Sequence, residues 1–288
     1  MAFTSIAAML KAARAARLPL WEVILEDDRN DRGASREASL RQMASLWEAM
    51  KTAQKSYSPQ ARSSSGLVGG DGAKMRGLTE GASVGGAFVD RVIAEALSMG
   101  ESNACMKRIV AAPTAGSCGV LPSVLIPVAE RGGIGDEDAV KALYVAAGFG
   151  QVIAARASIS GAEGGCQAEV GAASGMAAAA LVCMKKGTPQ MSANACVMAL
   201  MNLMGLVCDP VAGLVEIPCV KRNVIGAMNA VSCADMALAG IESRVPPDEV
   251  IDAMRAVGDA MPCALRETGQ GGLAATPFGT AAAEKLRK

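Results

Sequence analysis

The chain has 288 residues, with 28 basic and 28 acidic side chains, nine cysteines and no histidine. Without histidine it can build neither a Ser–His–Asp or Cys–His nucleophile pair nor a histidine-ligated zinc or haem site. A formal net charge of zero also argues against a nucleic-acid partner, because such proteins usually carry a basic surface.

The composition predicts an all-α fold. Hydrophobic residues make up 51% of the chain, yet aromatic residues make up only 3%, and 17 residues are methionine. Alanine and methionine favour helices, whereas strands are usually rich in aromatic and β-branched residues. We expect a single catalytic domain over residues 1–288, in which an N-terminal helical extension (1–60) precedes a core (61–288).

Two helices are expected in the N-terminal extension. The stretch Met1–Arg17 carries apolar residues on one face and basic residues on the other, which is typical of an amphipathic helix. A mitochondrial presequence has a similar pattern, but a solvated first helix is the simpler interpretation. Residues 33–54 place Leu40, Met43 and Trp47 at helical spacing.

A Ser/Gly-rich segment, Ser63–Gly72, follows this region. It is consistent with a linker, and equally with an anion- or substrate-binding loop, because Lys74 and Arg76 come directly after it.

Lys74 lies in Gly72–Gly77, which resembles the lysine motif of pyridoxal-phosphate enzymes that deaminate serine and threonine. In those enzymes the lysine amine forms a Schiff base with the cofactor. Their fold needs alternating strands and helices and a glycine run for the cofactor phosphate, neither of which this sequence provides. A pyridoxal-phosphate deaminase using Lys74 is therefore the alternative hypothesis.

From residue 88 onward, Ala/Met-rich helical runs alternate with Gly/Pro/Cys loops. Helices are expected at 88–99, 138–157, 170–185, 192–207, 222–240 and 247–260, and loops at 111–122, 160–169, 208–219 and 262–280. Val120–Val128 is the best candidate for a strand, although its prolines weaken it. The uncharged run Gly187–Cys208 is long enough to span a membrane, but its polar residues favour a buried helix. We expect no membrane segment and a cytoplasmic protein.

The nine cysteines fall into two groups. Four lie in helical runs and are expected to be buried as small hydrophobic residues: Cys105, Cys183, Cys196 and Cys233. Five lie beside Gly or Pro in loops: Cys118, Cys166, Cys208, Cys219 and Cys263. No Cys-x-x-Cys pair occurs, which argues against a zinc ribbon. With no histidine, a soft-metal site must use thiolates, and iron–sulfur is the natural candidate.

Five stretches resemble the alpha subunit of the iron–sulfur-dependent L-serine dehydratases. They are Ser65–Gly72, Arg108–Ser117, Gly165–Gly171, Cys208–Cys219 and Leu265–Thr268. The resemblance runs through most of the chain, and the Cys208–Cys219 motif is highly specific. It implies a helical domain in which three cysteines hold three irons of a [4Fe-4S] cluster, and the matching positions are Cys166, Cys208 and Cys219. The fourth iron would act as a Lewis acid in the elimination of water from L-serine, giving pyruvate and ammonia.

The resemblance also implies a partner. In this family a second domain or a separate beta subunit carries a Gly-Pro-Ser-Ser-Ser-His-Thr motif whose histidine is the expected base. This chain has no histidine, so we expect the base on a beta subunit; Lys74 or Lys107 is the less favoured choice. A non-catalytic helical protein that binds a cluster is the remaining alternative.

Four residues are candidates for binding the substrate. Arg108 and Arg222 suit a bidentate contact with the L-serine carboxylate, and Ser65 and Thr114 suit hydrogen bonds to the substrate. Structural ion pairs and helix capping are the alternative roles of these side chains.

Overall fold

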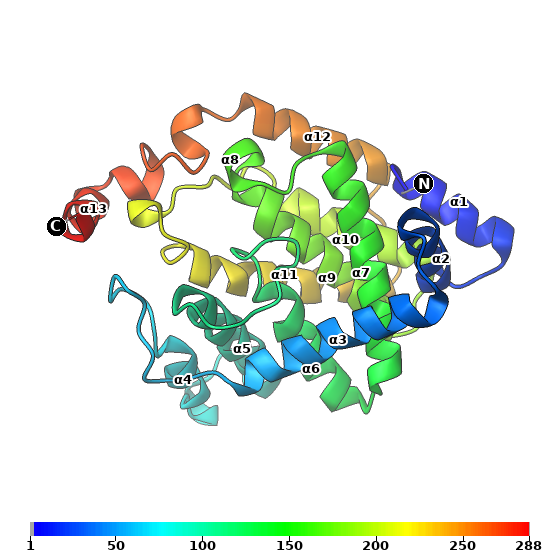
Figure 1. The fold of residues 1–288 in the computed structure, drawn as a ribbon, viewed down its shortest axis with the longest axis horizontal. Helices are drawn as coiled ribbons and strands as arrows, with labels where there is room; N and C mark the ends of the chain where they lie inside the picture. Colours follow the sequence, from blue (N-terminus) through cyan, green and yellow to red (C-terminus); the bar gives the residue numbers. More distant parts are fainter. Residues whose placement is uncertain (1–2, 288) are drawn as a thin grey trace.

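The computed structural model describes residues 3–287, and this part of the chain is built from helices (Figure 1). The α-helices are α1 (Ile6–Ala16), α2 (Leu20–Arg32), α3 (Arg36–Lys55), α4 (Asp71–Arg76), α5 (Gly86–Ala104), α6 (Val120–Gly132), α7 (Asp136–Arg156), α8 (Gly161–Gly164), α9 (Ala172–Met184), α10 (Pro189–Leu203), α11 (Cys219–Leu238), α12 (Pro247–Ala260) and α13 (Pro277–Arg287). In the described residues, β-type pairing is limited to one isolated bridge between Cys208 and Arg266. The all-α expectation is confirmed.

Helix α9 forms the centre of the core. It packs against α6, α7, α10 and α11, and its residues Ala177–Ala180 are fully buried. Small side chains allow the neighbouring helices to approach closely: a Cβ on Gly175 would lie 3.0 Å from Cys196 Sγ on α10. The window Gln167–Met184 is apolar and long enough to cross a membrane by composition, and 89% of it is buried inside the protein. Its apolar character therefore matches its place in the core.

The first three helices share this core. Helices α2 and α3 pack on α7, and α1 packs on α12. The backbone N–H of Ile6 donates to Asp248 Oδ1 at 2.7 Å, and the indole of the buried Trp47 donates to Asp136 Oδ1 at 2.7 Å. The N-terminal extension is thus joined to the rest of the chain by apolar packing and by polar contacts with α7 and α12.

The expected helices from residue 33 onward form with ends shifted by a few residues, and α1 forms within the first predicted helix, whose residues 1–2 lie outside the described part. The strand candidate Val120–Val128 is wrong, because these residues belong to helix α6. A fully buried apolar run does not reveal its period, and Pro122 occupies the first turn, where the backbone N–H needs no partner. Helices α2, α4, α8 and α13 were not predicted.

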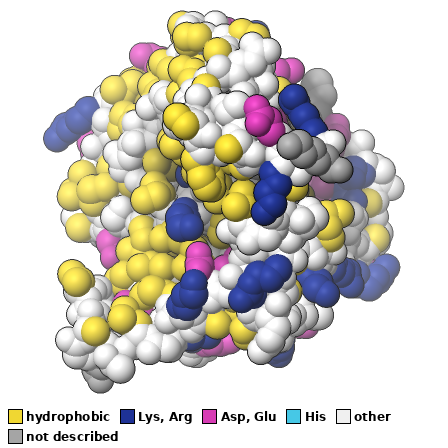
Figure 2. Space-filling model, turned by 90° about the vertical axis from the view of Figure 1, so that its left-hand side faces the viewer, with side chains coloured by type: hydrophobic (Ala, Val, Ile, Leu, Met, Phe, Trp, Pro, Cys, Tyr) yellow, Lys and Arg dark blue, Asp and Glu magenta, His cyan; other side chains and the backbone are white. Residues whose placement is uncertain are grey.

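The Gly/Pro/Cys loops gather at one end of the helical bundle, on the left in Figure 1. There, Asn223 of α11 donates to the carbonyl oxygen of Gly116 at 2.8 Å, and the N–H of Cys208 donates to the carbonyl oxygen of Leu265 at 2.8 Å. Segments far apart in the sequence therefore meet at this end. Figure 2 looks onto it and shows hydrophobic patches with Lys and Arg side chains between them.

Candidate functional site

Cys166 lies at a junction between two short helical segments, α8 and the π-helix η2 (Gln167–Gly171). Gly165, before it, has a φ of +73°, and a Cβ there would lie 2.8 Å from Met261 Sδ, so only glycine fits. The Gln167 side chain donates to Met254 O at 2.9 Å and accepts from the Gly205 N–H at 2.8 Å. These bonds fix the Cys166 segment against α12 and the chain that leads to Cys208.

Cys208 is held through its backbone. Its N–H donates to Leu265 O at 2.8 Å, and its carbonyl oxygen accepts from the Glu267 N–H at 2.7 Å. This short parallel bridge brings the segment after α12 beside the cysteine. The Leu265–Thr268 motif is therefore a neighbour of Cys208.

Cys219 is the first residue of α11, and one side chain ties it to the loop after α5. Asn223 donates to Cys219 O at 3.0 Å and to Gly116 O at 2.8 Å, while its Oδ1 accepts from the Gly119 N–H at 2.8 Å. Asn223 is buried, so these bonds form away from water. The Arg108–Ser117 motif is thereby fixed next to the start of α11.

The three cysteines come together in a largely buried site. Burial is the main cause that raises the pKa of Cys166 to about 11 and that of Cys219 to about 12. Burial also raises the pKa of Cys208, and the neighbouring Cys166 and Cys219 thiols raise it further. Because a soft metal binds the thiolate, a metal centre bound here would displace these protons.

Two glycines allow the thiol and carboxylate groups to approach closely. A Cβ on Gly161 would lie 2.9 Å from Cys208 Sγ, 2.7 Å from Glu169 Oε2 and 3.2 Å from Glu267 Oε2. A Cβ on Gly116 would lie 3.2 Å from Glu169 Oε1. Burial raises the pKa of Glu169, and the charge of Glu267 adds to this. The site thus combines thiols and two carboxylates, packed against glycines that have no side chain.

The arrangement fits a cluster better than a single ion. Within residues 3–287, no three His, Cys, Asp or Glu side chains are grouped closely enough to hold one metal ion. In an iron–sulfur cluster each cysteine binds a different iron, so the thiols surround the group instead of meeting at one point. Three thiols without a nitrogen ligand are the donor set that such a group prefers.

The other six cysteines differ from these three in their surroundings. All nine cysteines are free thiols. Cys118, Cys196 and Cys233 are buried, and Cys183 and Cys105 are partly buried. Of the four cysteines predicted to be buried in helices, Cys196 and Cys233 are buried, whereas Cys105 and Cys183 are only partly buried. Cys263 is exposed, and it lines a pocket of about 590 Å³ beside α8 whose wall also includes Gln167, Arg266 and Glu267.

The two predicted hydroxyl residues have different neighbours. The Thr114 hydroxyl group lies 3.2 Å from the Ser117 hydroxyl group and is close enough to Glu169 to lower the pKa of that carboxyl, against the larger effect of burial. Ser65 donates to Glu216, a buried carboxylate that also accepts from Ser63 at 2.9 Å. Ser65 therefore anchors the Ser/Gly loop to the chain between Cys208 and Cys219.

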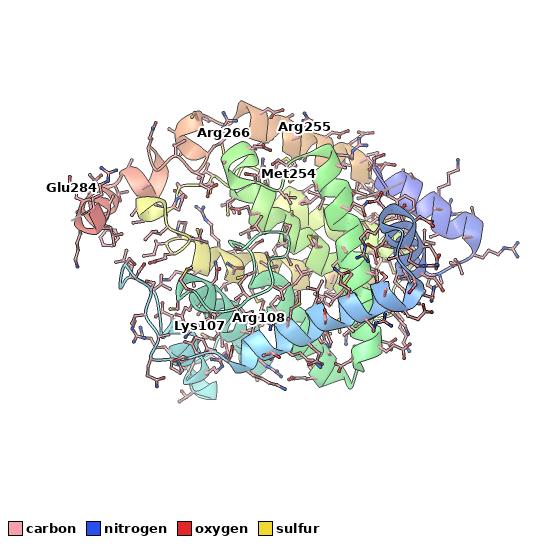
Figure 3. The ribbon with its side chains drawn as sticks, viewed as in Figure 1. Lys107, Arg108, Met254, Arg255, Arg266 and Glu284 are labelled. Atoms are coloured by element: carbon pink, nitrogen blue, oxygen red, sulfur yellow. The ribbon has the colours of Figure 1, made fainter. Side chains whose placement is uncertain are left out.

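The two arginines predicted to bind the substrate carboxylate differ in burial and in their contacts. Arg108 lies in the loop after α5 and is exposed, and Figure 3 shows it well apart from Arg255 and Arg266 of the α12 region. Arg222 is largely buried and pairs with Asp209, its Nη2 lying 2.8 Å from Oδ1. Its role is taken up below.

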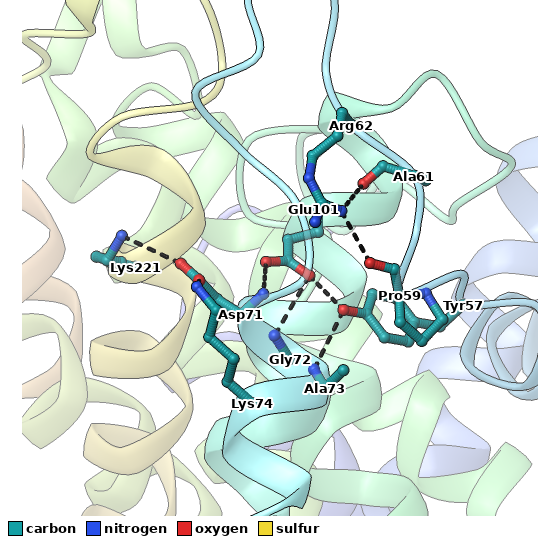
Figure 4. Close-up of polar contacts among 10 residues, drawn as sticks. All are labelled: Tyr57, Pro59, Ala61, Arg62, Asp71, Gly72, Ala73, Lys74, Glu101 and Lys221. Carbon is teal, nitrogen blue, oxygen red and sulfur yellow. Dashed lines mark hydrogen bonds and ion pairs between the residues drawn. The ribbon is translucent and has the colours of Figure 1, made fainter.

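Lys74, the residue of the alternative hypothesis, is exposed on α4. Its Nζ lies 2.8 Å from Asp71 Oδ1, and 79% of its side chain is accessible (Figure 4). Asp71 also faces Lys221 of α11 at 3.6 Å. Lys107 is exposed as well. Both lysines therefore lie on the surface of the protein.

Glu169, Glu267 and Asn223 are residues of the site that the sequence did not single out for chemistry. Glu169 falls within the Gly165–Gly171 motif, so its closeness to Cys166 was visible as a signal. Glu267 falls within the Leu265–Thr268 motif, although nothing in that motif shows that it meets Cys208. Asn223 lies outside the five motifs and reaches the site through contacts between segments far apart in the chain.

Comparison with known proteins gives a consistent result. Residues 15–274 match the family described as serine dehydratase alpha chain. The chain is 47% identical over 285 residues to the probable L-serine dehydratase, alpha chain, of Bacillus subtilis, covering 99% of this chain and 95% of that protein. It is 49% identical over 208 residues to the L-serine dehydratase, alpha chain, of Peptoniphilus asaccharolyticus, covering 72% of this chain and 70% of that protein.

Longer relatives match over part of their length. The L-serine dehydratase of Mycobacterium tuberculosis is 48% identical over 184 residues, which are 62% of this chain and 40% of that protein. More than half of that relative therefore lies outside the matched region.

Proposed function

We propose that this chain, which belongs to the serine dehydratase alpha-chain family, is the alpha subunit of an L-serine ammonia-lyase. In this reaction L-serine loses its α-proton and its hydroxyl group, and the enamine product hydrolyses to pyruvate and ammonia. The family match and the names of the relatives support this activity. They do not favour a pyridoxal-phosphate deaminase or a non-catalytic protein, and Lys74 is exposed and ion-paired.

The proposed cofactor is a [4Fe-4S] cluster held by Cys166, Cys208 and Cys219. The observation that carries this proposal is the meeting of three cysteines from separate segments in a largely buried site. When bound, such a cluster supplies Lewis acidity at an iron that carries no protein thiolate, which favours departure of the hydroxyl group.

The protein around the thiols would bind and orient the substrate. Glu169 lies next to Cys208 and Thr114 lies next to Glu169, and we expect this carboxylate and hydroxyl group to bind the ammonium group of L-serine. Arg108 is exposed, and we expect its guanidinium to bind the substrate carboxylate. Ser65 would contribute to substrate binding by holding the Ser/Gly loop in place through its hydrogen bond to Glu216.

The proposed partner is a beta subunit that supplies the base. Removal of an α-proton near neutral pH needs a group whose pKa is close to the working pH, and histidine is the usual choice. This chain has no histidine, and the relatives that it matches over most of their length are named alpha chains. The nine free thiols support a cytoplasmic location, where cysteines stay reduced.

Anaerobic purification followed by assay of iron and acid-labile sulfide tests the cofactor. We expect iron and sulfide in equal amounts, at the stoichiometry of one four-iron cluster per chain. Pyruvate formation from L-serine after mixing with a beta subunit tests the activity. Protein without iron or sulfide, or with an absorption band that borohydride removes, would contradict the cluster and favour pyridoxal phosphate.

A further inference from the structure

Arg222 lies one turn after Cys219 on α11 and bonds to both sides of Cys208. Its Nη1 donates to the carbonyl oxygen of Val207 at 2.7 Å, and its Nη2 donates to Asp209 Oδ1 at 2.8 Å. Val207 and Asp209 are the two chain neighbours of Cys208. A single planar side chain thus fixes the position of the Cys208 segment relative to the helix that begins with Cys219.

Asp209 makes this attachment rigid. Its side chain is 5% exposed, and its second oxygen accepts from the Leu273 N–H at 2.8 Å. A Cβ on the preceding Gly272 would lie 2.3 Å from Asp209 Oδ2, and the φ of this glycine is +58°, so the segment approaches as closely as only glycine permits. Arg222, Asp209 and the chain after α12 therefore form one buried network.

The third cysteine also faces this guanidinium. Arg222 is close enough to Cys166 for its positive charge to lower the pKa of that thiol, against the larger effect of burial. It acts in the same direction on Cys219. One cation is therefore next to Cys166, on the helix of Cys219 and bonded to both neighbours of Cys208.

This geometry is unsuited to the clamp on the substrate carboxylate that the sequence suggested for Arg222. Only 15% of the Arg222 side chain is exposed, and its two terminal nitrogens already donate to Val207 O and Asp209 Oδ1. Turning toward a substrate would leave the Asp209 carboxylate buried without its counter-charge, which is strongly unfavourable.

We propose that Arg222 is a positioning residue for the cluster: it sets the relative placement of the three cysteine segments and holds a fixed positive charge beside their thiolates. This inference rests on the proposed function, because it assigns Arg222 to the cofactor of that same site. Several thiolates on one cluster concentrate negative charge in a buried place, and an adjacent guanidinium offsets it.

The test compares Arg222→Gln and Arg222→Lys with Lys221→Gln, an exposed neighbour on the same helix. Each variant of the full chain is reconstituted anaerobically, and the rate of iron loss to a chelator is followed together with the visible spectrum. We expect at least tenfold faster iron loss in Arg222→Gln, an intermediate rate in Arg222→Lys because lysine lacks the fork of donors, and a wild-type rate in Lys221→Gln.

Thermal unfolding of the apo variants separates this role from general destabilisation. If an apo variant does not fold, Asp209→Asn, which keeps the shape of the side chain, replaces it in the same assay. Wild-type iron retention in Arg222→Gln with a raised KM for L-serine would overturn the inference and favour the substrate clamp. Wild-type protein that never acquires iron and sulfide would instead overturn the proposed cofactor.

Discussion

Cys196 and Cys208 are both buried, but the two thiols have different neighbours. Cys196 is fully buried on α10, close to Gly175 of α9 in the Ala-rich core. Cys208 faces two other thiols and the carboxylates of Glu169 and Glu267. Burial alone does not mark a ligand, whereas the neighbouring thiols do.

Replacing each of these cysteines by alanine therefore has different consequences. We expect Cys208→Ala to lose bound iron and sulfide, because the cluster loses a ligand. We expect Cys196→Ala to keep both and to lose about 1 kcal/mol of stability from a small cavity. Iron and sulfide assays with urea unfolding measure the two effects. Iron loss in Cys196→Ala together with iron retention in Cys208→Ala would show that the ligand assignment is wrong.

The phenol of Tyr57 offers a test of the contacts around Glu101. Burial, and then its hydrogen bond to Glu101, raise the pKa of Tyr57 from 10.0 to about 12. Because the pKa is raised in the folded state, the protonated phenol contributes stability below pH 10, and this contribution is lost as the pH rises through 12.

In a Tyr144→Phe variant, Tyr57 is the only remaining tyrosine, since the chain has two. We expect its tyrosinate absorbance to appear well above pH 10 in the folded protein, and near pH 10 in urea. Glu101→Gln should shift the folded-state titration toward that of the unfolded chain. A folded-state midpoint at the unfolded value would contradict the contact.

At the scale of elements, the Glu101 carboxylate joins α5 to the start of α4. Glu101 is 2% exposed and accepts from the N–H groups of Asp71, at 2.6 Å, and Gly72, at 3.3 Å, and from Tyr57 Oη at 2.6 Å (Figure 4). Helix α4 has only six residues, too few to be stable by itself. Its position depends on this carboxylate and on packing against α5.

Glu101→Ala should therefore destabilise the protein by about 3 kcal/mol, because it leaves buried donors without an acceptor. Glu137→Ala, which removes an exposed ion pair with Lys141 on α7, is the matched control and should change stability by less than about 0.5 kcal/mol. Urea unfolding monitored by circular dichroism measures both. Equal stability of the two variants would show that α4 is held by packing alone.

The pattern of apolar and charged residues in each helix explains which helices the sequence could predict. Long runs with a clear helical period, such as α7 and α12, were found almost to the residue. Helix α2 was missed because more than half of its residues are charged, and only Leu20, Val23, Ile24 and Leu25 are buried. Helix α6 was mistaken for a strand because its apolar residues face the core on all sides.

For the whole molecule, the motifs could be recognised in the sequence but their meeting could not. Cys166, Cys208 and Cys219 belong to separate segments, and the contacts that unite them run through Asn223, Arg222 and the bridge between Cys208 and Arg266. Such contacts depend on how the helices pack, which no local pattern encodes. The resemblance to the L-serine dehydratases identified the three cysteines as one set. The fold places the charged residues Arg222, Glu169 and Glu267 next to them.

The chain has no histidine, and this bears on how it could carry out the reaction. Elimination of water from L-serine needs a base for the α-proton, and a well-placed base contributes about 10²–10⁴-fold to the rate. Lys74 and Lys107 are both exposed, and Lys74 is paired with Asp71. We therefore expect the chain with a full complement of iron and sulfide to form pyruvate at least about a hundredfold more slowly alone than with a beta subunit that carries the Ser-Ser-His-Thr motif. Replacing the histidine of that motif should remove the gain without changing the iron content of this chain. Rapid pyruvate formation by the cluster-loaded chain alone would show that the base belongs to this chain. Glu169 would then be the first residue to replace, because its carboxylate and the Cys208 thiol both lie against Gly161.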